Sequence, residues 1–305
     1  MRRSALASAA LAATALLLAG CAGAGAGEPQ DDRPVVLTTF TVLADIAGAV
    51  AGDDLRVESI TRPGAEVHGY EPTPRDVARA SEADLLLDNG LGLEAWFERF
   101  VQDADAPRVV ASEGVEPIEI AADASAGRPN PHAWMSPTNV QRYVDTIEAA
   151  FAELAPEHAE GFAERADAYR AELQQVQDEL VADLAAVPEQ QRALVTCEGA
   201  FSYLARDAGL EERSLWPVNA EQQATPQRIA DVIAFVEERD VPAVFCESTV
   251  SDAPMQQVVE ATGARFGGTL YVDSLSEADG PVPTYLDLIR HDAETIAAGL
   301  TGGGR

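Results

Sequence analysis

The chain has 305 residues, of which 51 are acidic and 21 basic, and its formal net charge is −30 at pH 7. A hydrophobic share of 47% with 24% charged residues is typical of a globular protein and excludes a fibrous or fully disordered chain. A charge this negative repels phosphate groups, which excludes nucleic acid and an anionic lipid surface as main partners. The length suffices for about two domains, each with its own core.

The first segment of the chain has the features of an export signal. Met1-Arg2-Arg3 precedes an apolar run that is too short for a membrane span. Leu18-Ala19-Gly20-Cys21 matches a bacterial lipobox, in which Cys21 is lipidated and becomes the mature N-terminus. The alternative is an ordinary cleaved signal with an incidental cysteine. We expect a signal peptide over 1–20, a lipid-anchored flexible tether over 21–34, and an extracytoplasmic protein anchored to the cell membrane.

From Val35 onward, short apolar runs alternate with amphipathic stretches of helical periodicity, such as Leu43–Ala51, Leu93–Gln102, Thr225–Arg239 and Ala253–Thr262. This alternation predicts βαβ units and parallel sheets. The expected strands are Val35–Thr39, Leu55–Ile60, Asp84–Asp88, Arg108–Ala111, Ala193–Cys197, Arg213–Trp216, Ala243–Cys246 and Arg265–Leu270. They fall into two groups, so we expect two α/β lobes, an N-terminal one over 35–138 and a C-terminal one over 191–305.

Residues 139–190, between the lobes, are almost continuously helical in pattern. One helix is predicted over Asn139–Leu154, and a second runs from Pro156 to about Ala186. The second carries one narrow apolar stripe, formed by Phe162, Ala166, Tyr169, Leu173, Val176, Leu180 and Leu184. A helix of this length favours a rigid strut that joins the lobes. The alternative is a helical layer on the surface of one lobe.

Two cysteines remain after Cys21, and each stands at the end of an apolar run: Cys197 and Cys246. An export compartment permits disulfides. One pair in a chain of this length is nevertheless not a disulfide framework. Buried thiols are the favoured interpretation, and a single strand-to-strand disulfide is the alternative that the sequence leaves open.

The candidate ligand residues follow the expected strands, because parallel α/β sheets bind ligands beyond the carboxyl ends of their strands. His68 and His132 lie in proline-stiffened loops of the N-terminal lobe, whereas Glu198 and Asp273 follow strands of the C-terminal lobe. Two imidazoles and two carboxylates suit a divalent ion such as Mn²⁺ or Fe²⁺. The sequence therefore predicts a metal site in the cleft between the lobes, with Glu247 as a candidate supporting carboxylate.

Five segments resemble a known family in their residues and in their order along the chain. They are His68-Gly69-Tyr70-Glu71-Pro72-Thr73-Pro74, Asn130-Pro131-His132-Ala133-Trp134, Glu198-Gly199-Ala200-Phe201-Ser202-Tyr203, Glu247-Ser248-Thr249-Val250 and Asp273-Ser274. They resemble the metal-binding lipoproteins, or solute-binding proteins, of bacterial manganese, iron and zinc ABC importers (cluster A-I, the zinc-uptake/adhesin-like family). The resemblance covers nearly the whole mature chain.

The resemblance implies two (β/α)₄ lobes joined by a long rigid helix, with one metal in the cleft. Carried over by position, the metal ligands are His68, His132, Glu198 and Asp273. The implied function is to capture a divalent transition metal and deliver it to an ABC permease and its ATPase subunit. We expect a monomer that binds no nucleic acid and reaches the membrane through its lipid anchor.

The identity of the metal is less constrained. Zinc members of the family commonly have a His-rich loop in the first lobe and a third histidine near the position of Glu198, and both are missing from this sequence. Their absence favours Mn²⁺, followed by Fe²⁺ or Zn²⁺, and a zinc-specific protein of the same family is the alternative. Asn130 stands where the family often has aspartate. An isolated site with these ligands would still bind Zn²⁺ more tightly than Mn²⁺.

Three other function classes fit the sequence less well. Glu198 and Glu247 both end strands and would suit a glycoside hydrolase, but a long central helix does not fit a β/α barrel. A metallohydrolase needs an open coordination position and a general base, and no open position is obvious if all four candidate residues bind the metal. No residue speaks separately for a surface adhesin. We therefore expect a binding protein and not an enzyme.

Overall fold

The computed structural model describes residues 31–101, 104–121, 125–218 and 224–302. Cys21 and the expected signal peptide lie outside these residues. Within the described part of the chain, no helix is both long and apolar enough to cross a membrane. The fold described below begins at Pro34.

The N-terminal lobe is built on one parallel sheet with the strand order β2-β1-β3-β4. β1 lies in its centre, where Val36 pairs with Val57 on one side and with Leu85 on the other. Its elements are β1 (Val35–Thr38), α1 (Thr41–Ala51), β2 (Arg56–Ser59), α2 (Pro74–Glu82), β3 (Leu85–Asp88), α3 (Ala95–Phe100) and β4 (Arg108–Val110). All four strands match predicted ones. α2 is not among the predicted helices because it is mostly polar, although the Thr73–Asp76 capping box marks its start.

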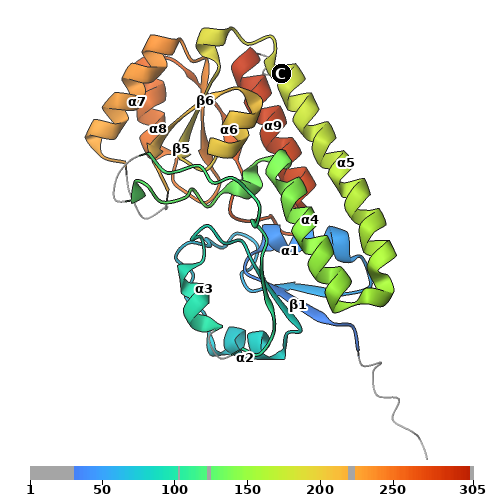
Figure 1. The fold of residues 1–305 in the computed structure, drawn as a ribbon. Helices are drawn as coiled ribbons and strands as arrows, with labels where there is room; N and C mark the ends of the chain where they lie inside the picture. Colours follow the sequence, from blue (N-terminus) through green and yellow to red (C-terminus); the bar gives the residue numbers. More distant parts are fainter. Residues whose placement is uncertain (1–30, 102–103, 122–124, 219–223, 303–305) are drawn as a thin grey trace, which may run out of the picture. The chain divides into compact units, whose positions relative to one another are not determined.

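The C-terminal lobe contains two pairs of parallel strands, β5 with β6 and β7 with β8. β5 and β7 lie next to each other (Figure 1). The elements are β5 (Ala193–Glu198), α6 (Ser202–Ala208), β6 (Glu211–Trp216), α7 (Pro226–Arg239), β7 (Ala243–Glu247), α8 (Ala253–Thr262), β8 (Arg265–Leu270) and α9 (Tyr285–Thr301). The strands of this lobe and the helix α8 also lie where the sequence predicts them.

Two long helices connect the lobes. α4 (Pro137–Leu154) is followed by a 3₁₀ turn (Pro156–His158) and by α5 (Ala159–Leu184). The 26 residues of α5 give it a length of about 39 Å. α5 packs along α4, against α1 of the N-terminal lobe, and against α6 and α9 of the C-terminal lobe (Figure 1). The predicted strut is therefore confirmed, because a layer on one lobe would not contact both.

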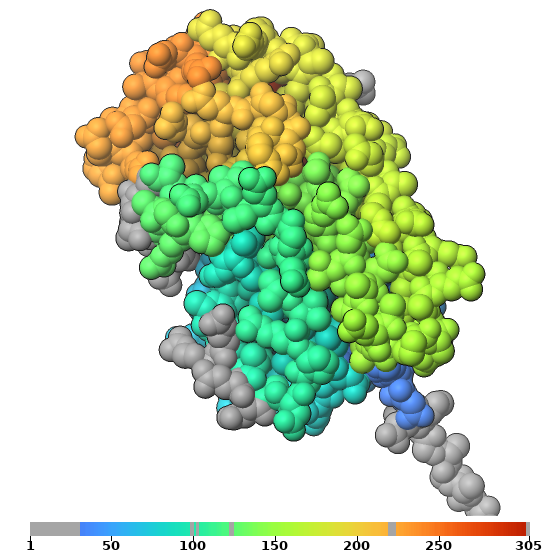
Figure 2. All heavy atoms as spheres, in the orientation of Figure 1, coloured from blue at the N-terminus to red at the C-terminus, as the bar shows by residue number. Residues whose placement is uncertain are grey.

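The hydrophobic core is continuous from one lobe to the other. The whole apolar stripe of α5 is buried in it, together with the facing side of α4. The segment between β4 and α4, green in Figure 2, covers the surface where the two lobes meet. This segment leads into the turn that carries His132 and thereby places it beside the C-terminal lobe.

Candidate metal site

The four side chains predicted as metal ligands come together in the structure. His68 lies in the loop between β2 and α2, and His132 precedes a short 3₁₀ turn, Ala133–Met135, at the start of α4. Glu198 is the last residue of β5, and Asp273 lies shortly after β8. Ends of strands and stiff loops from both lobes thus converge on one point, as expected for ligands of parallel sheets.

The candidate ligand atoms face one another at short range. The Nε2 atoms of His68 and His132 are 3.1 Å apart. The Nε2 of His68 is 3.8 Å from Glu198 Oε1 and 4.0 Å from Asp273 Oδ1. The Nε2 of His132 is 3.8 Å from the same Glu198 oxygen and 3.7 Å from the same Asp273 oxygen. The Glu198 oxygen and the Asp273 oxygen thus each lie within 4.0 Å of both imidazole nitrogens. Two groups here could hold a metal ion, His68 with His132 and Glu198, and His68 with Glu66 and Asp273.

The site is buried, and one of its carboxylates forms no hydrogen bond with any described residue. The side chains are only 5% exposed for His68, 0% for His132 and 1% for Asp273. Both carboxylate oxygens of Asp273 are buried and have no hydrogen-bond partner among the described residues. An unpaired buried carboxylate is costly, and a bound cation would remove that cost.

Burial also shifts the protonation of the site. It raises the pKa of Asp273 to about 7, with the charges of Glu198 and Glu66 adding to the rise and His68 opposing it. Burial lowers the pKa of His132 well below its usual range, and the neighbouring His68 lowers it further. His132 is therefore neutral near pH 7 and has a lone pair to offer to a metal.

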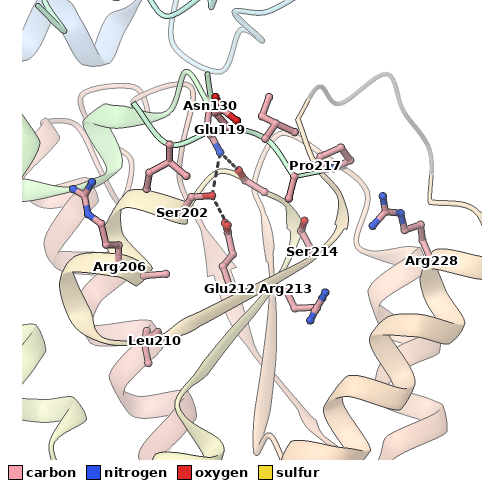
Figure 3. A pocket seen from close by; sticks show the side chains of 15 residues that line it. Glu119, Asn130, Ser202, Arg206, Leu210, Glu212, Arg213, Ser214, Pro217 and Arg228 are labelled. Atoms are coloured by element: carbon pink, nitrogen blue, oxygen red, sulfur yellow. Dashed lines mark hydrogen bonds between the residues drawn. The ribbon is translucent and has the colours of Figure 1, made fainter. Parts of the chain in front are cut away.

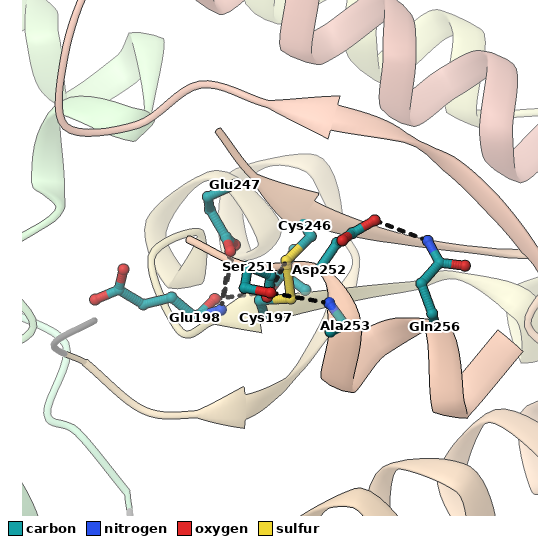
Figure 4. Close-up of a disulfide and its surroundings, with 9 residues drawn as sticks. Cys197, Glu198, Cys246, Glu247, Ser251, Asp252, Ala253 and Gln256 are labelled. Carbon is teal, nitrogen blue, oxygen red and sulfur yellow. Dashed lines mark hydrogen bonds between the residues drawn. A yellow bond between two sulfur atoms is a disulfide. The ribbon is translucent and has the colours of Figure 1, made fainter. Parts of the chain in front are cut away.

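Glu247 does not join the four ligands. Its two carboxylate oxygens accept the backbone N–H of Glu198 at 3.3 and 3.2 Å. Burial raises the pKa of Glu247 well above its usual value, and the charge of Glu198 raises it further. In Figure 4 the Glu247 carboxylate lies at the Glu198 backbone, whereas the Glu198 carboxylate extends away from it. Glu247 thus supports the end of β5.

Cys197 and Cys246 form a disulfide, so the favoured expectation of two buried thiols is wrong. The bond joins β5 to β7 one residue before Glu198 and one residue before Glu247 (Figure 4). The sequence places both cysteines at strand ends, but it does not show that these two strands are neighbours at the same level. That information comes only from the packed lobe.

Two further contacts hold the loops of the site and were not predicted. The carboxylate of Glu66 accepts the backbone N–H groups of His68 at 2.6 Å and Gly69 at 2.8 Å. Across the lobes, Ser274 Oγ accepts the N–H of Gly64 at 2.7 Å. The position of Glu66, two residues before the candidate ligand His68, is a weak sequence signal. The contact between Ser274 and Gly64 has no sequence signal, because it joins the two lobes.

Comparison with known proteins identifies the family. Residues 36–299 match the family described as zinc-uptake complex component A, periplasmic, or ZnuA. The chain belongs to this family. The resemblance noted in the sequence is therefore confirmed, as is the expected fold of two α/β lobes with parallel strands. The ZnuA family consists of substrate-binding transport proteins and not of enzymes, which argues against both hydrolase alternatives.

Individual relatives are similar over most of their length. The chain is 51% identical over 266 residues to the iron-binding protein YfeA of Yersinia pestis, covering 87% of this chain and 86% of the relative. It is 33% identical over 289 residues to the manganese-binding lipoprotein MntA of Halalkalibacterium halodurans, covering 94% and 95%. The solved Mn-bound periplasmic metal-binding protein of Candidatus Liberibacter asiaticus superposes with a TM-score of 0.83 at 36% identity, covering 88% of this chain and all of that one.

Proposed function

We propose that this protein captures one divalent transition metal ion between its lobes and delivers it to the permease of an ABC importer and the associated ATPase. His68, His132, Glu198 and Asp273 are the proposed ligands. The observation that carries the proposal is the buried, unpartnered carboxylate of Asp273, which faces two imidazole nitrogens. The two carboxylates would neutralise the 2+ charge of the ion inside a buried site.

Mn²⁺ is the proposed cargo, with Fe²⁺ or Zn²⁺ as alternatives. The four-residue cluster contains oxygen and nitrogen donors and no sulfur, a combination that suits Mn²⁺ and Fe²⁺. Relatives named for iron at 51% identity and for manganese at 33% identity support the same range. The ligand types alone would still favour Zn²⁺ over Mn²⁺ by intrinsic affinity. The geometry of the site and the availability of each metal must therefore contribute to selection.

The proposal includes the location of the protein. Removal of 1–20 would leave Cys21 as a lipidated N-terminus, followed by the tether 21–34. The N-terminal lobe 35–138, the connecting helices 139–190 and the C-terminal lobe 191–305 would then act as one monomer outside the cytoplasmic membrane. Relatives named as a manganese-binding lipoprotein and as a substrate-binding lipoprotein of a manganese ABC transporter support this arrangement.

Calorimetric titration with Mn²⁺ tests the ligand set. Loss of a residue that only hydrogen-bonds a metal ligand typically lowers metal affinity by about 10–100-fold. We expect Glu198→Ala and Asp273→Ala each to lower the affinity by more than this. Glu260→Ala, an exposed acid on α8 of the same lobe, is the control and should leave the affinity unchanged. Wild-type affinity in both ligand variants would remove these residues from the site. Elemental analysis of the native protein, followed by competition among Mn²⁺, Fe²⁺ and Zn²⁺, identifies the cargo.

A further inference from the structure

Among the described residues, the polar group behind the imidazole of His132 is the side-chain amide of Asn130. The Oδ1 of Asn130 lies 2.9 Å from the Nδ1 of His132 and accepts the backbone N–H of the same residue at 3.1 Å. The other end of the amide, Nδ2, donates to the carbonyl oxygen of Gly199 at 2.7 Å and to Ser202 Oγ at 3.1 Å. A carbonyl oxygen only accepts, so the amide end that faces Gly199 must be the NH₂ group.

This orientation determines where His132 carries its proton. With Oδ1 turned towards the ring, Nδ1 of His132 must be the N–H donor of that bond. The Nε2 then keeps its lone pair, and Nε2 is the atom 3.8 Å from Glu198 and 3.7 Å from Asp273. The opposite tautomer would place two lone pairs together at Asn130 and a hydrogen where a metal would bind.

The amide is itself fixed by the C-terminal lobe. Ser202 Oγ donates to the carboxylate of Glu212, which also accepts the N–H of Phe201 at 2.8 Å. Figure 3 shows Asn130, Ser202 and Glu212 in one hydrogen-bonded row along a cavity of about 420 Å³. The hydroxyl of Tyr203 adds a bond to the backbone oxygen of Asn130 at 2.8 Å. All of these partners follow Glu198 in the chain.

We propose that Asn130 is a positioning residue for metal binding. It selects the Nδ1–H tautomer of His132, and it ties that imidazole to the lobe that carries Glu198. His132 therefore precedes the connecting helices in sequence but is held by the lobe that follows them. The inference rests on the proposed function for the identity of the ligand, a divalent metal ion. The tautomer itself is a property of the metal-free protein.

The first measurement needs no metal. Long-range ¹H–¹⁵N correlation spectra of the metal-free protein, with His132 assigned by loss of its signals in His132→Gln, should show the Nδ1–H tautomer in the wild type. In Asn130→Ala the Nε2–H tautomer should appear, because the oxygen that accepts the Nδ1–H bond in the wild type is gone. Asn130→Asp keeps an acceptor beside Nδ1 and should restore the wild-type tautomer. An unchanged tautomer in Asn130→Ala would overturn the proposal.

The second measurement is the affinity for Mn²⁺ of the same variants. Asn130→Ala should bind about 10–100-fold more weakly, the range for a lost partner of a metal-binding histidine. The Mn²⁺ affinity of Asn130→Asp should lie between those of Asn130→Ala and the wild type. Aspartate keeps the acceptor beside Nδ1 but turns a second oxygen towards the Gly199 carbonyl. Asn139→Ala is the control: Asn139 contacts the same turn through the oxygen of Ala133 and does not touch His132. It should retain both tautomer and affinity.

The two measurements separate the two proposals. A changed tautomer in Asn130→Ala with wild-type affinity would overturn the positioning role. A wild-type protein that binds none of Mn²⁺, Fe²⁺ and Zn²⁺ would overturn the proposed function, while the spectra would still decide whether Asn130 sets the tautomer of His132.

Discussion

His68 and His132 present the same atom to the same site, yet the protein holds them in different ways. The ring of His132 is backed by Asn130 and lies against Trp134, with ring centroids 5.1 Å apart. His68 is tied through its backbone to Glu66, and no described residue hydrogen-bonds its Nδ1. From this comparison we expect the position and tautomer of His132 to be set before binding, and the ring of His68 to be freer to adjust to an ion.

Removing either imidazole should change the Mn²⁺ affinity more than substitution of Glu66 in the loop of His68. We expect His132→Ala to abolish tight Mn²⁺ binding, with a loss above the about 100-fold that marks the upper range for outer partners. It also leaves a cavity at a fully buried position, so the free energy of unfolding of the metal-free protein should fall by about 2–4 kcal/mol. His68→Ala should lose less affinity and, having no partner behind the ring, less stability. Calorimetry and urea denaturation measure the two quantities.

A reversed order would break the comparison. If His68→Ala lost more affinity than His132→Ala, the adjustable ligand would be the dominant one and a prearranged His132 would have no advantage.

Acidity should sharpen the comparison, because the groups of the site respond to pH differently. Burial keeps His132 neutral, whereas it raises the pKa of Asp273 to about 7. Below that pH, the metal must displace a proton from Asp273, so the affinity should fall by up to about tenfold per pH unit from pH 7 downward and level off above it. Titration in two buffers of different ionisation enthalpy counts the released protons. A flat profile with no proton release at about pH 6 would contradict this assignment.

The smallest expected effect concerns the loop of His68. Glu66→Gln leaves one oxygen to accept the two N–H groups that the carboxylate now accepts, and it removes their charge assistance. Mn²⁺ should bind less tightly by about 1 kcal/mol, or about fivefold, mainly through faster dissociation measured by stopped flow. Glu71→Gln, an exposed acid on the same loop, is the control. The His132 tautomer should be unchanged in both variants.

Much of this protein can be predicted from its sequence, because the relevant signals are local. The strands can be predicted from short apolar runs. His68 and His132 can be identified because each lies in a proline-stiffened loop beyond a strand end. The contact of Asn130 with Gly199 could not be predicted, since it joins residues 69 apart across two lobes. The Cys197–Cys246 bond depends in the same way on β5 and β7 being neighbours. Local patterns thus predict which four side chains come together, and only the packed lobes show how they are held.

The disulfide has a consequence for metal analysis of the protein. Cys197 Sγ, Cys246 Sγ and a Glu247 oxygen lie within 4.8 Å of one another, close enough to hold an ion if the sulfurs were thiolates. Soft thiolate ligands favour Zn²⁺ and Cu⁺ over Mn²⁺. In the oxidised chain both sulfurs are bonded to each other, which removes a competing soft site directly behind Glu198. A metal analysis of this protein should therefore be accompanied by a thiol count, because reduction of the Cys197–Cys246 bond would create two thiolates that could bind metal beside Glu247.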